Sequence, residues 1–146
     1  MISLQDARNK IEQYQEKYRN ANLPNFEISD VYDLFPDEKS KSNRPKWPDT
    51  WPNADRQGVY LMLADNLSLL YIGKVSLSNT FGGRFTGYFC YDDNKKCKPI
   101  HSNWSQMPKY VVTVAVPRGM AFEAPALEEY LITEFKGQLP DNKLGN

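Results

Sequence analysis

The stretch GVYLMLADNLSLLYIGK, residues 58–74, constrains the fold more than any other part of the chain. Val59–Ala64 and Leu69–Ile72 are apolar runs separated by the turn residues Asp65 and Asn66, a pattern that predicts a β-hairpin. Each strand also carries a tyrosine close to a glycine, in GVY at 58–60 and in YIG at 71–73. A hairpin alone requires neither residue, so these two motifs ask for a further explanation.

The remaining sequence predicts helices and one more strand around this hairpin. A β-branched run closed by a proline predicts a strand buried on both faces at 110–116. Helices are predicted over 3–21, weakly over 78–89, and over 123–136, with a proline-rich irregular stretch at 22–53 and a polar loop at 94–103. The fold class is therefore α+β, with a small mixed or antiparallel sheet of about three strands flanked by helices. We divide the chain into an N-terminal helix with an irregular extension, residues 1–55, and a main region, residues 56–146.

The first helix has one apolar face and a predicted start. Ser3 and Asp6 form a capping box in which Asp6 replaces the usual glutamate. Leu4, Ala7, Ile11, Tyr14, Tyr18 and Ala21 follow helical spacing along a single face. This face must be buried, either on the main region or on a second subunit, so a homodimer through this helix is one expectation.

Composition limits the classes of partner. The chain has 146 residues, a formal net charge of +0 and a sequence pI of about 6.6, which argues against avid nonspecific binding to nucleic acid. Any nucleic-acid site must be a local patch, and the candidates are Lys39, Lys41, Arg44, Lys46, Lys74, Arg84, Lys95, Lys96, Lys98 and Lys109. Such charged runs are also typical of an ordinary solvated surface. No apolar run fits a membrane span or a signal peptide, so we expect a cytoplasmic protein.

One carboxylate of the last helix falls on the apolar side. With about 100° per residue, Leu127, Leu131 and Phe135 define an apolar arc that also contains Glu128, whereas Glu129 lies about 200° from Leu127 and outside this arc. A buried carboxylate is costly unless a cation or hydrogen-bond donors compensate it. Two interpretations remain open: an ion pair with an arginine or lysine, or a divalent metal such as Mg²⁺, which prefers oxygen ligands.

A second candidate group lies in the weak helix, within TFGGRFTGY at 80–88. Arg84 and Tyr88 are four residues apart and share a face if the segment is helical. The planar guanidinium of an arginine suits a phosphate. Two glycines precede Arg84 at the predicted helix start, where they allow a close backbone approach.

Taken together, these motifs resemble those of the GIY-YIG nuclease superfamily. GVY at 58–60 is followed after ten residues by YIG at 71–73 and then by Lys74. Arg84, Tyr88, the LEEYLI helix with Glu128, and the P-x-N element at 140–142 follow in the family's order. Residues 1–55 match no pattern of the family. A few extra residues around 76–81 precede Arg84, and the proline–asparagine element comes slightly late, so Asn146 is an alternative to Asn142.

The resemblance implies a divalent-metal-dependent DNA endonuclease and gives each residue a role. Glu128 would hold one Mg²⁺ or Mn²⁺, and Arg84 would bind the phosphate whose charge builds in the transition state. Tyr60 would be the general base or would position the attacking water, with its pKa lowered by Lys74 or Tyr71. Tyr88 would contact the phosphate or the nucleophile, and Asn142 would orient Tyr60 or the metal ligands. The sequence does not decide which tyrosine takes the proton.

Three functional hypotheses follow from the resemblance. The first is a small endonuclease that cuts both strands as a dimer. The second is a single-strand or structure-selective nickase. The third is a non-catalytic module that binds DNA or protein. Phosphate contacts carry little sequence information, so target recognition needs a further element. The candidates for this element are residues 1–55 and the Asp92–Trp104 loop.

Overall fold

The computed structural model describes residues 1–35, 50–91, 97–100 and 103–142, and they form an α+β fold around an antiparallel sheet. The three main strands are β3 (Gly58–Leu63), β4 (Leu69–Val75) and β7 (Tyr110–Ala115), with β3 in the middle. Two short strands, β1 (Glu27–Ile28) and β2 (Tyr32–Asp33), pair with the outer edge of β7. Among these described strands every pairing is antiparallel, so the antiparallel alternative of the sequence prediction is the correct one.

The predicted hairpin is present, and its register sorts side chains onto two faces. Tyr60 lies opposite Gly73 across β3 and β4, and Leu61 lies opposite Ile72. Because successive residues of a strand point to opposite sides, Tyr60 and Leu61 enter different hydrophobic clusters. All six residues of β3 are buried, as expected for a central strand covered on both faces.

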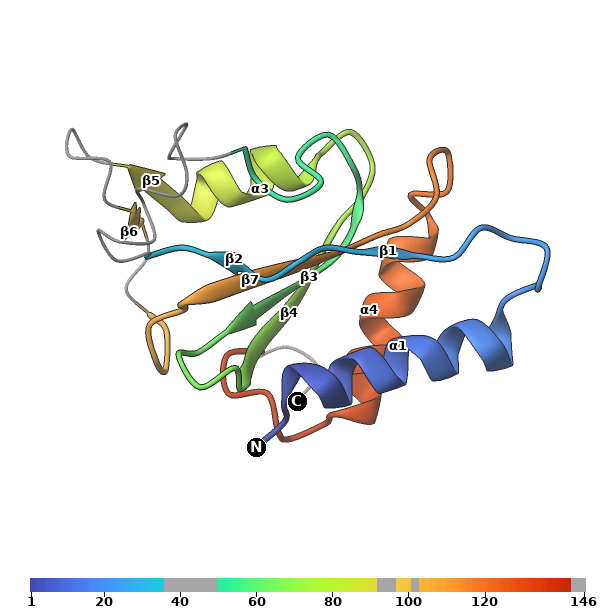
Figure 1. Cartoon of the computed structure of the whole chain (residues 1–146), viewed down its shortest axis with the longest axis horizontal. Helices are drawn as coiled ribbons and strands as arrows, with labels where there is room; N and C mark the ends of the chain where they lie inside the picture. Colours follow the sequence, from blue (N-terminus) through green and yellow to red (C-terminus); the bar gives the residue numbers. More distant parts are fainter. Residues whose placement is uncertain (36–49, 92–96, 101–102, 143–146) are drawn as a thin grey trace.

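One face of the sheet is covered by α1 (Leu4–Tyr18) and α4 (Glu123–Glu134). Figure 1 shows both helices on the opposite side of the sheet from α3 (Phe81–Tyr88). The capping box of Ser3 and Asp6 is confirmed, and Leu4, Ala7 and Ile11 are buried against the sheet and α4. Of the two predicted docking places, the apolar face of α1 uses the main region of its own chain. Residues 1–35 therefore share a core with the region after residue 56, and a homodimer stays a prediction.

Helix α1 is shorter than predicted because Arg19 leaves the helical conformation. Its φ of −104° and ψ of 143° are extended, and its guanidinium pairs with Glu123 at the start of α4. The same side chain also donates to the carbonyl of Pro24 and lies 4.3 Å over the Phe26 ring. Tyr18 at the helix end remains 65% exposed, so the predicted apolar face is buried only over its first three turns.

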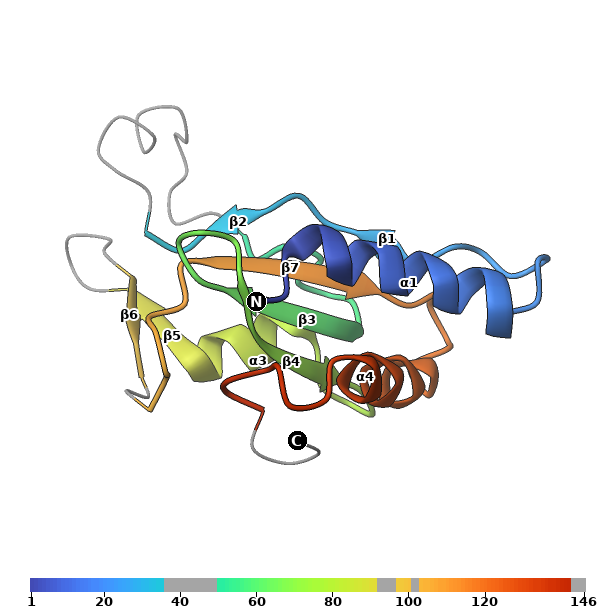
Figure 2. The ribbon, with the colours of Figure 1, turned by 90° about the horizontal axis from the view of Figure 1, so that it is seen from below.

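The opposite face is covered by α3 and by the segment around Trp51. Thr80 caps α3 by accepting a hydrogen bond from the Gly83 backbone, which explains why the helix begins at Phe81, just before the two glycines. Figure 2 shows a short hairpin, β5 (Phe89–Tyr91) and β6 (Cys97–Pro99), beyond the end of α3. The predicted polar loop at 94–103 is thus wrong for 97–99, which pair with β5.

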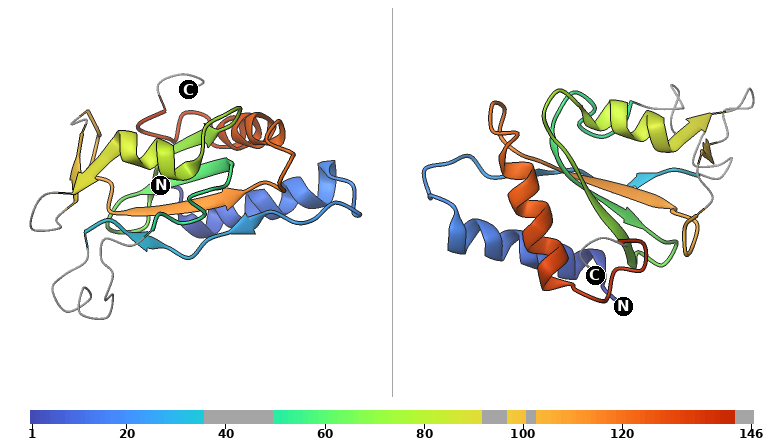
Figure 3. Two further views of the ribbon diagram at one scale, coloured as in Figure 1. Left: turned by 90° about the horizontal axis from the view of Figure 1, so that it is seen from above. Right: turned by 180° about the vertical axis from the view of Figure 1, so that it is seen from behind.

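The segment after α4 returns to the free edge of β4, as the right-hand view of Figure 3 shows. The Asp141 N–H donates to the carbonyl of Leu70, and the side-chain amide of Asn142 bonds to the backbone of Ile72. This segment therefore gives β4 hydrogen-bond partners on the side away from β3. Among the described helices none has the length and apolar composition needed to cross a lipid bilayer.

Candidate functional site

The glycines of the hairpin are explained by close packing. A Cβ at Gly73 would lie 2.3 Å from the Tyr60 hydroxyl oxygen and 2.7 Å from Cε1 of Tyr71. The ring of Tyr60 therefore lies directly over Gly73 on the neighbouring strand. Gly58 has a φ of +152°, and its Cβ would lie 2.0 Å from the Val114 carbonyl oxygen. Gly58 therefore allows the backbone of β7 to approach closely, and Gly73 leaves room for the phenol ring of Tyr60.

Three tyrosines from three elements meet on this face. The hydroxyl oxygens of Tyr60, from β3, and Tyr88, from α3, are 3.0 Å apart in a hydrogen bond. The Tyr71 ring of β4 lies 6.0 Å from the Tyr60 ring. Arg84, one helical turn before Tyr88, is exposed and close enough to lower the pKa of Tyr60. The predicted residues Tyr60, Tyr71, Arg84 and Tyr88 therefore lie together, and we name the three phenols the tyrosine cluster.

The pKa values of this cluster contradict one expectation. Burial raises the pKa of Tyr60 far above its usual 10.0, and the Tyr71 and Tyr88 phenols raise it further, whereas Arg84 opposes the rise. The prediction that Tyr71 lowers the pKa of Tyr60 is wrong because a second phenolate nearby would repel the first. Burial raises the pKa of Tyr71 to about 12, with Tyr88 adding to this rise. Tyr60 is also only 1% exposed, whereas Tyr71 is half-buried.

Glu128 lies on the inner side of α4, as its helical position predicts. Its side chain is half-buried, whereas Glu129 is exposed. Burial raises the pKa of the Glu128 carboxyl, and Lys74, Arg84 and a hydrogen bond with the Lys74 backbone only partly offset this. Within the described part of the chain, Glu128 forms no salt bridge with a lysine or arginine. The simple ion-pair interpretation therefore lacks its partner among these residues.

The donor set around Glu128 suits a hard cation bound through one carboxylate. The described residues contain no group of three histidine, cysteine, aspartate or glutamate side chains able to hold a metal. Among the described residues a metal here would therefore be held by fewer than three such side chains, and Glu128 as its ligand stays a prediction. Mg²⁺ commonly uses one or two carboxylates and keeps several waters, and a half-buried carboxylate that pairs with no lysine or arginine of the described residues fits this mode of binding.

The predicted cations are only partly located. Lys74 is half-buried beside Glu128, and its ammonium lies 3.3 Å from the Ser76 hydroxyl. Lys109 pairs with Asp33, so its charge is already compensated. Lys98 lies in β6 opposite Cys90. The positions that lie outside the described residues are Lys39, Lys41, Arg44, Lys46, Lys95, Lys96 and the alternative Asn146.

Asn142 contacts the backbone of β4. Its Oδ1 accepts from the Ile72 N–H and its Nδ2 donates to the Ile72 carbonyl, both at 2.8 Å. Asn142 is 5% exposed, and its side-chain amide forms the hydrogen bonds that a neighbouring strand would form at the edge of β4. It therefore holds the backbone next to Tyr71, and its expected role of orienting Tyr60 or a metal stays a prediction.

Trp104 is part of the site, although the sequence identified it only as the end of a candidate loop. Its indole lies 5.8 Å from the ring of Tyr71 and 5.8 Å from the ring of Tyr88. The only sequence signal for this residue was a tryptophan at the end of a polar loop. Its packing against Tyr71 and Tyr88, which are distant in the sequence, could not be predicted.

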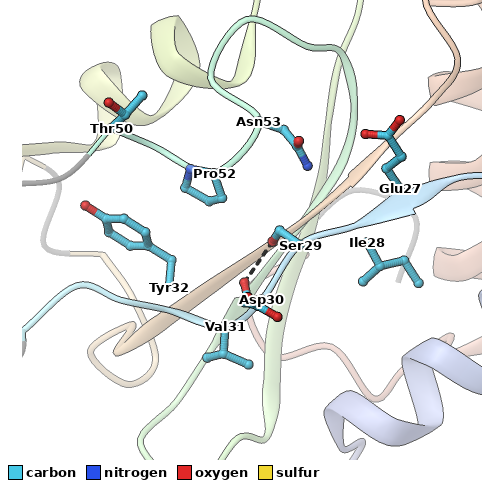
Figure 4. Close-up of a pocket in the computed structure, with 9 residues that line it drawn as sticks. All are labelled: Glu27, Ile28, Ser29, Asp30, Val31, Tyr32, Thr50, Pro52 and Asn53. Carbon is cyan, nitrogen blue, oxygen red and sulfur yellow. Dashed lines mark hydrogen bonds between the residues drawn. The ribbon is translucent and has the colours of Figure 1, made fainter.

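The other edge of the sheet contains a separate hollow, shown in Figure 4. It has a volume of about 600 Å³ and lies between β1, β2 and the segment at 50–53. Its lining includes Glu27, Ser29, Asp30, Tyr32 and Asn53. None of the predicted site residues within the described chain lines it. The tyrosine cluster instead lies on the α3 side of the sheet, next to the opposite edge.

No protein-family model, curated protein or solved structure matches this chain. The functional assignment therefore rests on the residues themselves and on their arrangement.

Proposed function

We propose that this protein is a divalent-metal-dependent DNA endonuclease of the GIY-YIG type. The observation that carries the proposal is the arrangement around β4, where the tyrosine cluster, Arg84, Lys74 and Glu128 are close enough to influence one another's ionisation. These groups match the needs of phosphodiester hydrolysis: a hydroxyl that positions water, a cation for the phosphate and a carboxylate for a metal.

Glu128 would hold the cation, with Mg²⁺ as the expected ion. When bound, such an ion stabilises negative charge on the scissile phosphate and the leaving oxygen. Arg84 is exposed and would bind a non-bridging phosphate oxygen, because its guanidinium is free to project from α3. Lys74 sits beside Glu128 and would neutralise a neighbouring phosphate.

The two motif tyrosines have different tasks in this proposal. Tyr60 is 1% exposed and hydrogen-bonded to Tyr88, so it serves as an anchor for the Tyr88 hydroxyl. Tyr71 is more accessible and its pKa, about 12, is less strongly raised. We therefore assign Tyr71 as the phenol that contacts the attacking water, with Tyr60 keeping the cluster in place.

The decisive experiment incubates the protein with supercoiled plasmid and Mg²⁺. Glu128→Ala should abolish cleavage, and Glu129→Ala, which alters an exposed neighbour on the same helix, should cut like wild type. Mg²⁺ should also raise the melting temperature of wild type but not of Glu128→Ala, since a bound ligand stabilises the folded state. Linear product would indicate cutting of both strands, and open circles would indicate nicking.

Failure has a clear form in this experiment. Wild type that leaves plasmid, branched and single-stranded DNA intact would overturn the nuclease assignment and favour a non-catalytic binding module. Full activity in Glu128→Ala would instead contradict the metal assignment.

The pH dependence tests the assignment of Tyr71. A general base acts in its deprotonated form, so the rate should rise with pH, up to about tenfold per unit, below the Tyr71 pKa of about 12. Tyr71→Phe should lower the rate by about 10²- to 10⁴-fold, the range typical of a lost general base, and should flatten the pH profile. If Tyr60→Phe flattens the profile and Tyr71→Phe does not, then Tyr60 is the base.

A further inference from the structure

Trp104 stands at the accessible side of the tyrosine cluster. Its ring is inclined by 86° to that of Tyr71 and by 49° to that of Tyr88, so neither phenol is stacked flat on the indole. The side chain is partly exposed, unlike the core aromatic residues Phe81 and Phe85. Part of a large aromatic ring is thus accessible to a ligand beside the tyrosine cluster.

The position of Trp104 is fixed by its neighbour. The Ser105 N–H and hydroxyl both donate to the Asp141 carboxylate, each at 2.8 Å. Asp141 and Asn142 bind the backbone of Leu70 and Ile72, the residues on either side of Tyr71. One short segment therefore holds Tyr71 and Trp104 in a fixed relation, as a preformed binding surface requires.

A cation near the tyrosine cluster indicates what this ring binds. Arg84 is exposed one helical turn from Tyr88, whose ring contacts Trp104. Aromatic rings combined with a cation that suits a phosphate are usual in proteins that bind single-stranded nucleic acid. In a duplex the faces of the bases are covered by their neighbours, whereas an unpaired base can stack on a protein ring.

We propose that Trp104 stacks on an unpaired nucleobase next to the phosphate that the site cleaves. This inference rests on the proposed DNA-cleaving function and narrows its substrate to DNA that is single-stranded or unpaired at the cut. It also gives Trp104, the last residue of the candidate recognition loop, a specific contribution to recognition. Trp104 is then a substrate-binding residue, and Asp141 is a positioning residue that acts through Ser105.

Binding measured without metal tests the proposal apart from cleavage. A fluorescein-labelled oligonucleotide and the same strand annealed to its complement are titrated in EDTA, with anisotropy as the readout. Trp104→Ala should weaken binding of the single strand by about tenfold or more, the size expected when one base loses its stacking partner. Binding of the duplex should change by less than about twofold.

Salt dependence separates stacking from charge. Trp104→Ala should leave the slope of log Kd against log salt unchanged, whereas Arg84→Ala should reduce the slope by about one because a phosphate contact is lost. Trp104→Leu keeps an apolar side chain against Tyr71 and Tyr88. If the alanine variant does not fold, the same binding measurements are made with the leucine variant. Tyr18→Ala removes an exposed ring on α1 and should leave both affinities unchanged.

Asp141→Asn tests the positioning role. It should weaken single-strand binding less than Trp104→Ala does, and in the Trp104→Leu background it should have no further effect. Equal losses on single strand and duplex, or no loss on the single strand with Trp104→Leu, would overturn the proposal. Absence of cleavage by wild type on any DNA would overturn the nuclease assignment alone, because the binding comparison is made in EDTA and does not depend on cleavage.

Discussion

The two faces of the sheet are built from different side chains. On the side of α1 and α4, β3 contributes Val59, Leu61 and Leu63 to a largely aliphatic cluster. On the side of α3, the same strand contributes Tyr60 and Met62 to a cluster rich in aromatic rings. Aliphatic side chains can only fill space, whereas a tyrosine packs its ring and still presents a hydroxyl group at its tip. The aliphatic face thus contributes packing alone, and the aromatic face combines packing with hydroxyl groups.

Substitutions at two adjacent residues of β3 test this difference between the two faces most directly. Leu61→Ala should reduce the free energy of unfolding by about 2–5 kcal/mol, because it removes fully buried methyl groups and leaves a cavity. Tyr60→Phe keeps the ring and removes one hydrogen bond, so it should cost only about 0.5–1.5 kcal/mol. Urea denaturation measures both. A larger loss for Tyr60→Phe than for Leu61→Ala would show that the hydroxyl network, and not packing, stabilises the sheet.

A second comparison uses two glycines of the aromatic side. Gly73→Ala should destabilise the protein by about 1–3 kcal/mol and disturb Tyr60, because its Cβ would overlap that ring. Gly87→Ala in α3 meets nothing within 4 Å and should be neutral or stabilising by up to about 1 kcal/mol. Thermal melting and near-ultraviolet circular dichroism give the readout. Equal stability for the two variants would mean that Tyr60 does not rest on Gly73.

The smallest effect concerns Glu128, which lies on α4 but is close enough to raise the pKa of Tyr71 on the other face. Burial raises the pKa of Glu128 above 4.5, so the folded protein holds this proton more tightly than the unfolded chain does. Its contribution favours folding below pH 4.5 and is lost as the pH rises through the folded-state pKa. Without metal, Glu128→Gln should therefore be slightly more stable than wild type near neutral pH, and the difference should close below pH 4.5.

Glu129→Gln is the matched control for this measurement, since its side chain is exposed on the same helix. It should show no comparable change in urea midpoint between acidic and neutral pH. Wild type that is more stable than Glu128→Gln at neutral pH would mean that neighbouring cations already compensate the carboxylate.

The parts of the fold that were predictable are those with a local signal. The β3–β4 hairpin follows from two apolar runs and a turn, and β7 follows from a β-branched run. Strands β1 and β2 are two residues long and exist because β7 pairs with them, which no local pattern reveals. The end of α1 is set by the contact of Arg19 with Glu123, far away in the sequence.

The site was predictable where helical or strand geometry determines direction. Helical periodicity placed Glu128 on the inner side of α4, and the spacing of Arg84 and Tyr88 placed both on one helix. The electrostatics was not predictable, because the pKa of Tyr60 depends on its complete burial and on a hydrogen bond with Tyr88. The contact of Asn142 with Ile72 was not predictable for a similar reason, because Ile72 takes part through its backbone and not through a distinctive side chain.

The amide of Asn142 has a consequence for how this molecule behaves among its own copies. An open strand edge is a template on which another chain can add a strand, and such edges promote aggregation. Here a side chain and the Asp141 N–H already use the backbone groups of Leu70 and Ile72. The asparagine therefore keeps the outermost main strand from recruiting neighbours, and Asn142→Ala should lower the concentration at which the protein remains monodisperse in light scattering.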